Sequence, residues 1–499
     1  MNESIYSNTI ISKTGLEIPV LKNGKTIESR YNPEREADGQ ILQFEEGSAF
    51  FLVIGIGSGI LIKKLLENIP SARIIAVEYS DCDLSFLMNL PVVKDLSEND
   101  FVSFATNKKL CDTLCANYLP SRDGNISIYE NRVWASENKD KHLEIKKQIN
   151  LALTKIKSDF SVQAHFGKIW QKNIVKNLKL ASKNKLSFFL TQSELKKKAA
   201  VIAAGPTLDK TINKLNSDEY YIIATDTAFS ALLKNHIIPD CVVSLDGQEV
   251  SLNHFMRLGL RGLTKTTFFF DLCSNFTAAK KICDKKLRLF YFTSGHPLSE
   301  YASLTAKNSF LPLYSGSGTV TISAVDLALK LGFSKIDVFG ADFSYSSGKS
   351  YTKGTYLDSL YAKASSRILS TEKQFASLMF RTELKKTKNN TYTTNILESY
   401  KESLENYLKN MNLNFINSDD LYRITLTKND SEKLSVKNLI CETAVQNFNY
   451  EEFIKKLKRE GSYIHLLPYI AWLRKKMNFA SCSFEDLCKL ATESLVSYN

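Results

Sequence analysis

The sequence predicts an α/β protein with two Rossmann-like domains, whose sheets are mostly parallel, and an additional C-terminal α-helical domain. Short apolar runs that end in glycine or an acidic residue alternate with helical stretches in two separate regions. The chain has 499 residues, which is too long for one ordinary core. Past about residue 360 the patterns are amphipathic and helical. The expected divisions are an N-terminal domain at 1–140, a helical linker at 141–195, a central domain at 196–360 and the helical domain at 361–499.

Composition places the chain among globular proteins, since 43% of residues are hydrophobic and 24% are charged. No apolar run reaches the ~18–20 residues that a membrane span requires. The N-terminus, MNESIYSNTI, lacks the basic and then apolar pattern of a secretory signal. We therefore expect a cytoplasmic protein with no membrane span.

The net charge of +12 suits an anionic partner. However, the lysines are spread through helical stretches, and no usual nucleic-acid-binding motif is present, so we expect no nucleic acid partner. Among nine cysteines only Cys111 and Cys115 lie close together, and no second pair follows at zinc spacing. We expect reduced thiols and no metal bound by them, and no motif specifies an oligomeric state.

The first domain begins with the run FFLVIG, which is typical of a buried parallel strand. The turn GIGSG leads into a helical pattern, and the next strand, ARIIAVE, ends on Glu78. Gly55, Gly57 and Gly59 together with Glu78 would suit the adenosine end of S-adenosylmethionine or a dinucleotide. The spacing is G-x-G-x-G, one position short of the full nucleotide-binding pattern. A structural domain without ligand is the favoured interpretation, and a ligand site is the alternative.

The second alternating region contains six apolar runs, each closed by a small or acidic residue. They are KKAAVIAAG, YYIIATD, PDCVVSLD, KTTFFFD, LRLFYFTS and KIDVFGAD. Ligands of parallel sheets bind at the carboxyl ends of the strands, where these closing residues fall. The functional site is therefore expected in this domain.

Two features follow the first of these strands. Gly205, Pro206 and Thr207 form a strand-to-helix turn whose free amides would hold a phosphate, although a plain turn explains them equally well. Asp226 and Asp246 end the next two strands and would accept hydrogen bonds from a ribose or a base, or bind a metal. The alternative is that both aspartates only cap helices.

A third feature is the segment YSGSGTV, followed by GADFSYSSGKSY. A loop of small residues leads into a helix and forms a second anion cradle; its members are Ser315, Gly316, Ser317 and Gly318. Asp342 ends the following strand and is a catalytic candidate together with the two tyrosines that follow it. Tyr345 and Tyr351 flank a short glycine loop, where their hydroxyls would donate hydrogen bonds to a phosphate that leaves with negative charge.

Together these motifs resemble the motility-associated factor family, which is linked to flagellin glycosylation with nonulosonic acids. The central region is similar to the bacterial CMP-sialic-acid sialyltransferases, and the similarity covers roughly residues 195–355. The resemblance rests on AAGPTL, ATDTAFSALL, PDCVVSLDG, YSGSGTV and GADFSYSSGKSY. It implies a cytoplasmic glycosyltransferase with a CMP-nonulosonic acid as donor, serine or threonine of flagellin as acceptor, and no required cofactor.

The resemblance also implies roles for single residues. Gly205, Pro206 and Thr207 match a turn against the donor nucleotide, and Asp226 and Asp246 fall where sialyltransferases carry nucleotide-contacting asparagines. The loop that starts at Ser315 matches a second nucleotide loop. Tyr345 and Tyr351 align with a tyrosine pair on the leaving phosphate, just after Asp342.

This sequence departs from the sialyltransferases in two respects. Aspartates replace two amides, as in a related archaeal pterin diphosphokinase. The sialyltransferases also carry a histidine base downstream of the tyrosines, whereas this chain has no histidine between His296 and His465. Asp358, Glu372 and His296 are the candidates for that base.

Two alternatives remain open. In a diphosphokinase, Asp226, Asp246 and Asp342 would hold Mg²⁺ between phosphates. In a non-catalytic flagellin-binding factor, the basic helices after residue 360 would form the main surface.

Overall fold

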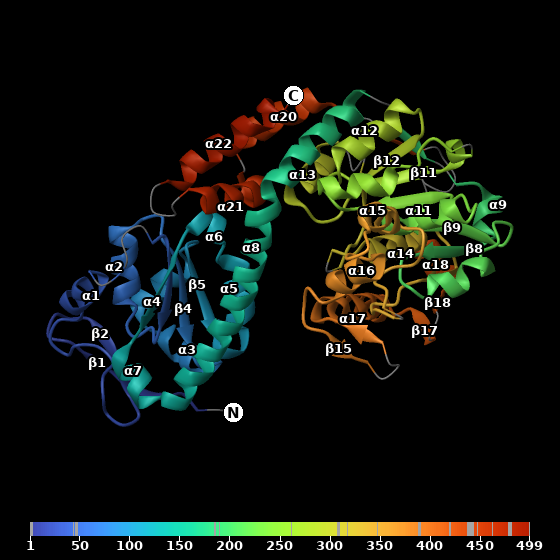
Figure 1. The fold of residues 1–499 in the computed structure, drawn as a ribbon. Coiled ribbons are helices and arrows are strands. Elements are labelled where there is room, and N and C mark those ends of the chain that lie inside the picture. The colour runs from blue at the N-terminus through green and yellow to red at the C-terminus, as the bar shows by residue number, and fades with distance from the viewer. Residues whose placement is uncertain are drawn as a thin grey trace. The chain divides into compact units, whose positions relative to one another are not determined.

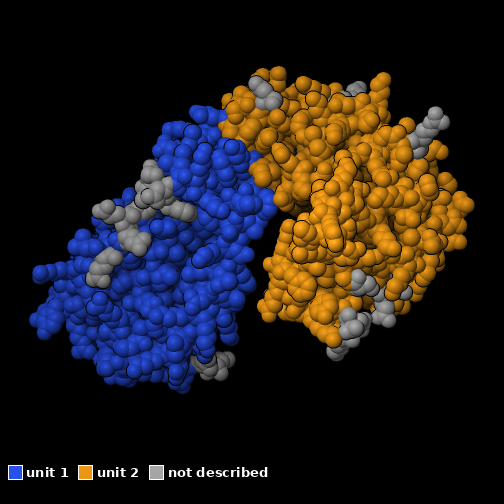
Figure 2. Space-filling view, viewed as in Figure 1, with its two compact units in different colours: residues 1–168, 466–493 blue, residues 169–465, 494–499 orange. Residues whose placement is uncertain are grey.

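The computed structural model divides into two compact units (Figure 2). Unit 1 comprises residues 1–168 and 466–493, and unit 2 comprises 169–465 and 494–499. The structure describes residues 3–42, 44, 48–183, 186–188, 190–260, 262–306, 310–316, 318–346, 348–387, 391–418, 421–436, 444–446, 448–461, 463–477 and 482–498.

Unit 1 is built on a four-stranded parallel sheet in the order β5-β4-β3-β6, of which β4 and β5 are labelled in Figure 1. Its strands are β3 (Phe50–Ile54), β4 (Arg73–Glu78), β5 (Val102–Thr106) and β6 (Ile126–Glu130). Strand β3 is buried along its whole length, as its continuous apolar run predicts. The chain moves from β3 to β4 and β5 on one side and returns to β6 on the other, so the topological switch point lies between β3 and β6.

Helices connect these strands, and an antiparallel hairpin precedes them. The hairpin is β1 (Tyr6–Ile11) with β2 (Glu17–Leu21), and the helices are α1 (Pro33–Ile41), α2 (Ile60–Asn68), α3 (Asp81–Leu87), α4 (Pro91–Ser97), α5 (Asn107–Asn117), α6 (Pro120–Asp123) and α7 (Arg132–Glu137). The core of unit 1 gathers the apolar faces of the sheet and of these helices.

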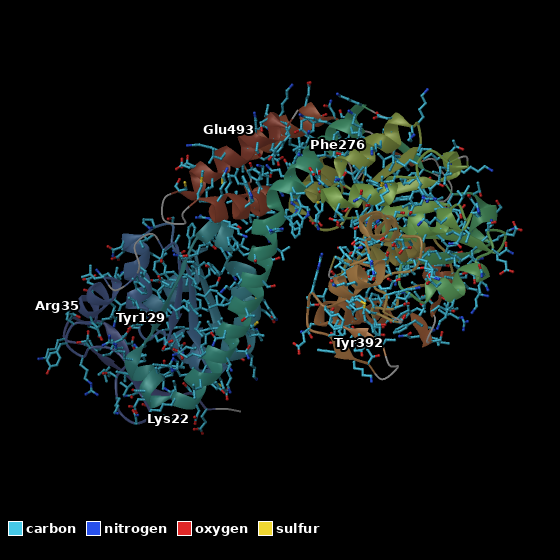
Figure 3. All side chains as sticks on the ribbon, viewed as in Figure 1. Lys22, Arg35, Tyr129, Phe276, Tyr392 and Glu493 are labelled. Atoms are coloured by element: carbon cyan, nitrogen blue, oxygen red, sulfur yellow. The ribbon has the colours of Figure 1, made fainter. Side chains whose placement is uncertain are left out.

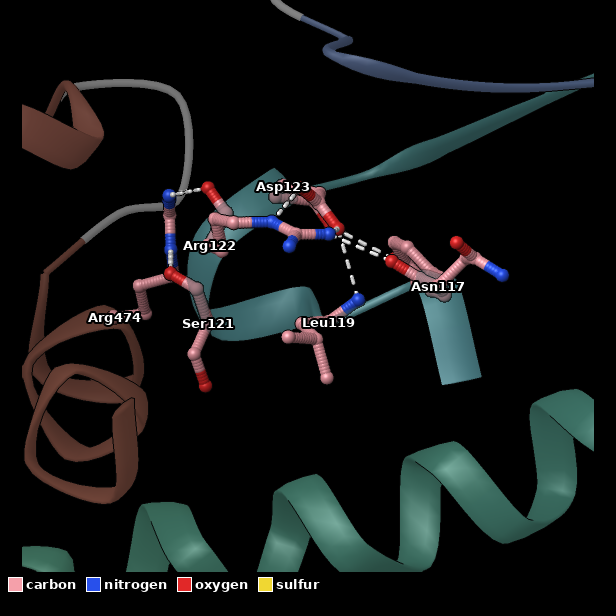
Figure 4. Close-up of polar contacts among 8 residues, drawn as sticks. Asn117, Leu119, Ser121, Arg122, Asp123 and Arg474 are labelled. Atoms are coloured by element: carbon pink, nitrogen blue, oxygen red, sulfur yellow. Dashed lines mark hydrogen bonds and ion pairs between the residues drawn. The ribbon is translucent and has the colours of Figure 1, made fainter. Parts of the chain in front are cut away.

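A C-terminal segment completes unit 1. Helix α21 (Leu467–Lys476) contacts α6, and the Arg474 guanidinium donates to the Ser121 carbonyl at 2.6 Å and to the Arg122 carbonyl at 3.2 Å (Figure 4). In the same network Arg122 pairs with Asp123 at 2.6 Å. Residues more than 300 positions apart thus form one unit, and the prediction of a separate C-terminal domain over 361–499 is wrong for this segment.

The predicted helical linker forms as α8 (Lys139–Lys183), a continuous helix of 45 residues. Its first part belongs to unit 1 and its last part to unit 2. The run without proline, with apolar residues at helical spacing, accounts for its length.

Unit 2 is built on a nine-stranded sheet in the order β13-β12-β11-β10-β9-β8-β14-β18-β17. The first seven are mutually parallel: β8 (Lys198–Ile202), β9 (Tyr220–Thr225), β10 (Cys241–Ser244), β11 (Thr267–Asp271), β12 (Arg288–Thr293), β13 (Leu311–Pro312) and β14 (Lys335–Phe339). All six predicted strands are present, which confirms the α/β class with parallel sheets. The switch point lies between β8 and β14, because β8 continues to β9 on one side and β14 joins on the other.

Strands β17 (Asn414–Ser418) and β18 (Leu421–Thr425) extend the sheet past β14 in antiparallel sense. The prediction that strands stop near residue 360 is therefore wrong. The amphipathic patterns beyond that point do form helices, but one face of α17 (Asn395–Asn410) packs into the core of unit 2 together with α14 (Val320–Lys330). Local periodicity predicts such a helix correctly and does not indicate which sheet it covers.

Shorter elements fill the remainder of unit 2. They are α9 (Gln192–Leu195), α10 (Leu208–Thr211), α11 (Asp226–Lys234), α12 (Phe276–Asp284), α13 (Pro297–Thr305), α15 (Tyr356–Ala364), α16 (Thr371–Met379), α18 (Lys428–Leu434), α20 (Tyr450–Glu460), the 3-10 helices η1 (Ile212–Lys214), η2 (Glu249–Phe255), η3 (Leu263–Lys265) and η4 (Tyr463–Leu466), and the antiparallel pairs β7 (Leu186–Phe188) with β19 (Ala444–Gln446) and β15 (Lys385–Lys386) with β16 (Tyr392–Thr393). Helix α22 (Phe484–Ser497) ends the chain. Within the described residues no helix is long and apolar enough to cross a membrane.

Candidate functional site

The switch point of unit 2 brings the first and last predicted motifs together. The Gly205 amide donates to the Gly340 carbonyl at 2.8 Å. A Cβ at Gly205 would lie 2.5 Å from that carbonyl oxygen, so only glycine fits at this approach. The backbones of the turn after β8 and of the loop after β14 are thus in direct contact.

The Asp342 carboxylate joins the loop after β14 to the turn after β8. Its carboxylate accepts the Thr207 amide at 2.7 Å and also the Thr207 hydroxyl. The amides of Leu208 and Asp209 donate to carbonyls of the same turn. In this conformation the turn therefore has no amide free for a phosphate, and its predicted role as a phosphate cradle would require rearrangement. Helix α10 is also only four residues long.

The two strand-end aspartates lie on neighbouring strands, as predicted. Asp226 is 2% exposed and accepts from the Ser244 hydroxyl at 2.8 Å and from the Thr227 amide at 2.7 Å. Asp246 accepts from the Ser251 hydroxyl at 2.6 Å. Because each carboxylate is held by serine or backbone donors, both are fixed in position at the carboxyl edge of the sheet.

The tyrosine loop is tied to the same edge. The Thr352 amide donates to the Ala204 carbonyl at 2.9 Å. Asp209 accepts from the Thr352 hydroxyl and from the Lys353 amide, the latter at 2.8 Å, and pairs with Lys349 at 3.3 Å. These contacts bring Tyr351 next to the Gly205 turn.

Tyr351 stands in a cluster of phenols. Burial is the main cause that raises its pKa to about 12, and the nearby phenols of Tyr345, Tyr356 and Tyr400 and the Asp226 carboxylate add to the effect. Burial likewise raises the pKa of Tyr356, to which the charges of Asp246 and Asp226 contribute. All these phenols stay protonated at neutral pH and are hydrogen-bond donors. The sequence motifs identified Tyr345 and Tyr351 but missed Tyr356 and Tyr400, which lie on helices α15 and α17.

Several buried polar atoms beside this cluster have no hydrogen-bond partner among the described residues. They are Ser350 Oγ and Thr355 Oγ1, which flank Tyr351 in the sequence, and Nδ1 of His254. The His254 ring packs edge-on against Tyr356 with 4.8 Å between ring centroids. Buried polar groups are nearly always satisfied, by protein, water or ligand, so these three atoms make the surroundings of Tyr351 a candidate binding site.

The second predicted anion cradle precedes α14. Gly316 and Gly318 have left-handed φ values of 55° and 86°, and the amides of Gly318 and Thr319 turn back to the Ser315 carbonyl. Helix α14 starts without a side-chain cap, so its first amides remain available to an anion. Ser317 lies outside the described residues. The opposite wall of this loop is Ser403 of α17, which approaches Gly316.

The predicted bases fall in different environments. Burial lowers the pKa of His296 to about 3, and its Nδ1 accepts from the Leu298 amide at 3.2 Å. Glu372 is fully exposed at the start of α16, and Asp358 accepts the Gly354 amide. His254 is the residue that the sequence argument missed. Its signal was its place eight positions after Asp246, in a chain with only six histidines.

In unit 1 a side chain of the same protein fills the space beside the glycine turn. The Glu28 carboxylate accepts the Ser58 amide and hydroxyl, each at 3.0 Å, and would clash with a Cβ at Gly57. Glu78 is fully buried and accepts from Tyr6, from the Ile56 amide and from Trp134, at 2.9, 2.9 and 3.1 Å. The remaining cavity is about 10 Å³, which is room for one water at most. This geometry favours the structural interpretation of the motif.

One comparison with known proteins locates a similarity in unit 2. The model of the 6-hydroxymethylpterin diphosphokinase MptE-like family matches residues 171–348, which is less than half of the chain. Two relatives from Treponema pallidum (strain Nichols), both called uncharacterized protein, are 37% identical over 145 residues and 35% identical over 150 residues. These alignments cover 28% and 29% of this chain, and 51% and 70% of the relatives.

The chain belongs to the same family as the second of these proteins. It spans about half the length of the first.

A solved structure, described as the Maf glycosyltransferase from Magnetospirillum magneticum AMB-1, aligns with 100% of this chain and 93% of its own chain, at 12% identity and a TM-score of 0.49. A superposition with this score carries no argument about function.

Proposed function

We propose that this chain is a glycosyltransferase that moves a nonulosonic acid from its CMP ester to a serine or threonine hydroxyl of flagellin. The observation that carries the proposal is the tyrosine cluster beside Asp226 and Asp246, with unsatisfied polar groups around it. The resemblance of the central motifs to sialyltransferases supplies the donor class, and the resemblance to motility-associated factors supplies the acceptor.

In the proposed reaction the bond between the anomeric carbon and the phosphate oxygen breaks through an oxocarbenium-like state. The CMP oxygen keeps the electron pair, and the hydroxyls of Tyr345 and Tyr351 donate hydrogen bonds to the new charge. The acceptor hydroxyl oxygen bonds to the anomeric carbon and loses its proton. We assign that proton to His254, because its imidazole lies against Tyr356 at the same strand edge.

A second candidate is a diphosphokinase, which the family match over residues 171–348 favours. In that reaction Asp226 and Asp246 would hold Mg²⁺ between the phosphates of ATP. Their present partners, Ser244 and Ser251, leave each carboxylate with lone pairs for a cation. No group of three or more acidic, histidine or cysteine side chains forms a metal cage within the described residues.

Calorimetric titration separates these functions. The chain is titrated with CMP and with ATP, each with and without Mg²⁺, and the measurement is repeated with Asp246→Ala. CMP binding without Mg²⁺ that weakens in the variant supports sugar transfer. ATP binding that requires Mg²⁺, with no heat from CMP, supports the diphosphokinase. Silence with both nucleotides contradicts both enzymes and favours a flagellin-binding factor.

A further inference from the structure

A cavity of about 320 Å³ is lined by Asp342 and by Ser344, which directly precedes Tyr345. Its walls come from the loop after β14, from Thr387, Thr391 and Thr393, and from the first turns of α17. Figure 3 labels Tyr392 on β16, whose backbone exchanges hydrogen bonds with Tyr345 at 2.6 and 2.9 Å. The cavity is therefore fixed to the loop that carries the proposed catalytic tyrosines.

Hydroxyl groups dominate the lining. Ser344, Thr387, Thr391 and Thr393 all contribute to it. The volume falls at the lower end of the range of small-molecule sites and suits a single sugar ring. Such a lining fits a ligand with many hydroxyls better than it fits an apolar ligand.

The charges in the cavity are unevenly satisfied. Asp342 is bound by Thr207, and Glu398 pairs with Lys385 at 2.7 Å. Lys401 lies on the same helix as Glu398, one turn further on, and forms no ion pair within the described residues. Lys401 is an exposed member of the lining, so its ammonium can pair with an anionic group of a ligand.

A strained residue also lines this cavity. Phe343 has a φ of 49°, a conformation that a bulky side chain rarely adopts. The Thr393 hydroxyl holds it there by donating to its carbonyl at 3.0 Å. Strain of this kind is kept at ligand sites, where the surrounding structure imposes it.

The loop that carries the tyrosines also lines the cavity. Ser344 is part of the lining and directly precedes Tyr345, whose backbone pairs with Tyr392 between the lining residues Thr391 and Thr393. A donor whose phosphate lies at Tyr345 would thus have its sugar beside this lining, which includes Lys401. We propose that this cavity receives the carboxylated sugar of the donor and that Lys401 binds its carboxylate. This inference rests on the proposed function and adds the sugar subsite to it.

Calorimetry with two ligands tests the subsite. The ligands are CMP and the 3-fluoro analogue of CMP-N-acetylneuraminic acid, in which the fluorine slows loss of CMP. Wild type should bind the sugar nucleotide about tenfold more tightly than CMP, as a charge-assisted hydrogen bond allows. Lys401→Met should lose that tenfold gain and keep its affinity for CMP. Lys401→Arg should retain most of the gain.

Lys409→Met is the matched control, since Lys409 is an exposed lysine of the same helix that does not line the cavity. It should bind both ligands as wild type does. Equal affinity of wild type for the two ligands, an unchanged Lys401→Met, or an equal loss for both ligands in Lys401→Met would each overturn the subsite. Absence of CMP binding in wild type would instead refute the proposed function.

Discussion

Each unit has a parallel sheet with a topological switch point, and the two units differ in what surrounds that point. In unit 1 the strands flanking the switch point are β3 and β6, and the space between their loops is filled by Glu28 and Trp134. In unit 2 they are β8 and β14, and nearby the buried hydroxyls of Ser350 and Thr355 have no hydrogen-bond partner among the described residues.

The comparison teaches that a glycine turn after a parallel strand is not by itself a ligand site. Gly57 is required in unit 1 because a carboxylate of the same chain occupies the space. Gly205 is required in unit 2 because a neighbouring strand loop does. Function is indicated by polar groups that remain unsatisfied beside hydrogen-bond donors, and in unit 2 Ser350 and Thr355 are such groups near the tyrosine cluster.

The largest expected effect is on turnover at the tyrosine cluster. Tyr351→Phe and Tyr345→Phe should each lower the rate of CMP release from a CMP-nonulosonate by ~10²–10³, because each removes one donor to the developing anion. Thermal unfolding should change little. Tyr392→Phe is the control, since its exposed phenol makes no hydrogen bond to the described residues. Normal turnover in both single variants would show that the tyrosines take no part in the reaction. The functional difference proposed between the two units would then lose its support.

The second effect is on the pH dependence of unit 1. Burial raises the pKa of Glu78 from 4.5 to about 7, against the opposing hydrogen bond from the Ile56 amide. The folded state therefore holds a proton that the unfolded state has lost, so its contribution to stability is present below about pH 4.5 and is lost as the pH rises through about 7. Burial raises the pKa of Glu28, in the same unit, to about 7 as well, so from pH 5 to 8 the two carboxyls together should lower the free energy of unfolding of unit 1 by about 4 kcal/mol.

Hydrogen exchange measures this change strand by strand, with rates converted to opening free energies. In unit 2 burial raises the pKa of Asp271 to about 6 and lowers that of His296 to about 3, and these two shifts oppose each other. Strands β8 and β9 should accordingly respond less than β3 and β4. An equal fall of the opening free energies in both sheets would show that the buried carboxyl groups do not make the pH dependence of the two units different.

A third, smaller effect concerns the glycine turn of unit 1. Gly57→Ala forces an alanine into φ 63° and displaces Glu28, and should cost about 2 kcal/mol of unfolding free energy. Gly15→Ala is the matched control, because Gly15 has φ 88° and open space around it, so it measures the backbone cost alone. Equal destabilisation in urea unfolding would mean that Glu28 yields without cost. Turnover should be normal in both variants.

The smallest effect is expected at the Lys349–Asp209 ion pair, which is 3.3 Å long and partly exposed. Lys349→Met should cost less than about 1 kcal/mol, because exposed pairs contribute little. The tyrosine loop stays tied through Thr352. A large loss of turnover, measured by CMP release, would show that charge rather than this hydroxyl holds the loop.

The sequence alone determined most of the parallel strands and many of the helices that connect them. Runs such as FFLVIG and YYIIATD form strands because continuous apolar segments must be buried on both faces of a parallel sheet. It also located the strand-end residues Gly205, Asp226, Asp246 and Asp342, because parallel strands present their carboxyl ends at one edge. These inferences depend on neighbours within about ten residues, where pattern and chemistry are linked directly.

Tertiary structure decided which of these groups are available. Glu28 lies 30 residues from Ser58, Trp134 lies 56 from Glu78, and Thr207 lies 135 from Asp342, and each pair is joined by hydrogen bonds. The tertiary structure likewise placed Tyr400 and Lys401 near the tyrosine loop. It also made β17 and β18 part of the central sheet. Local periodicity carries no information about such partners, because a hydrogen bond depends on position in space and not on distance along the chain.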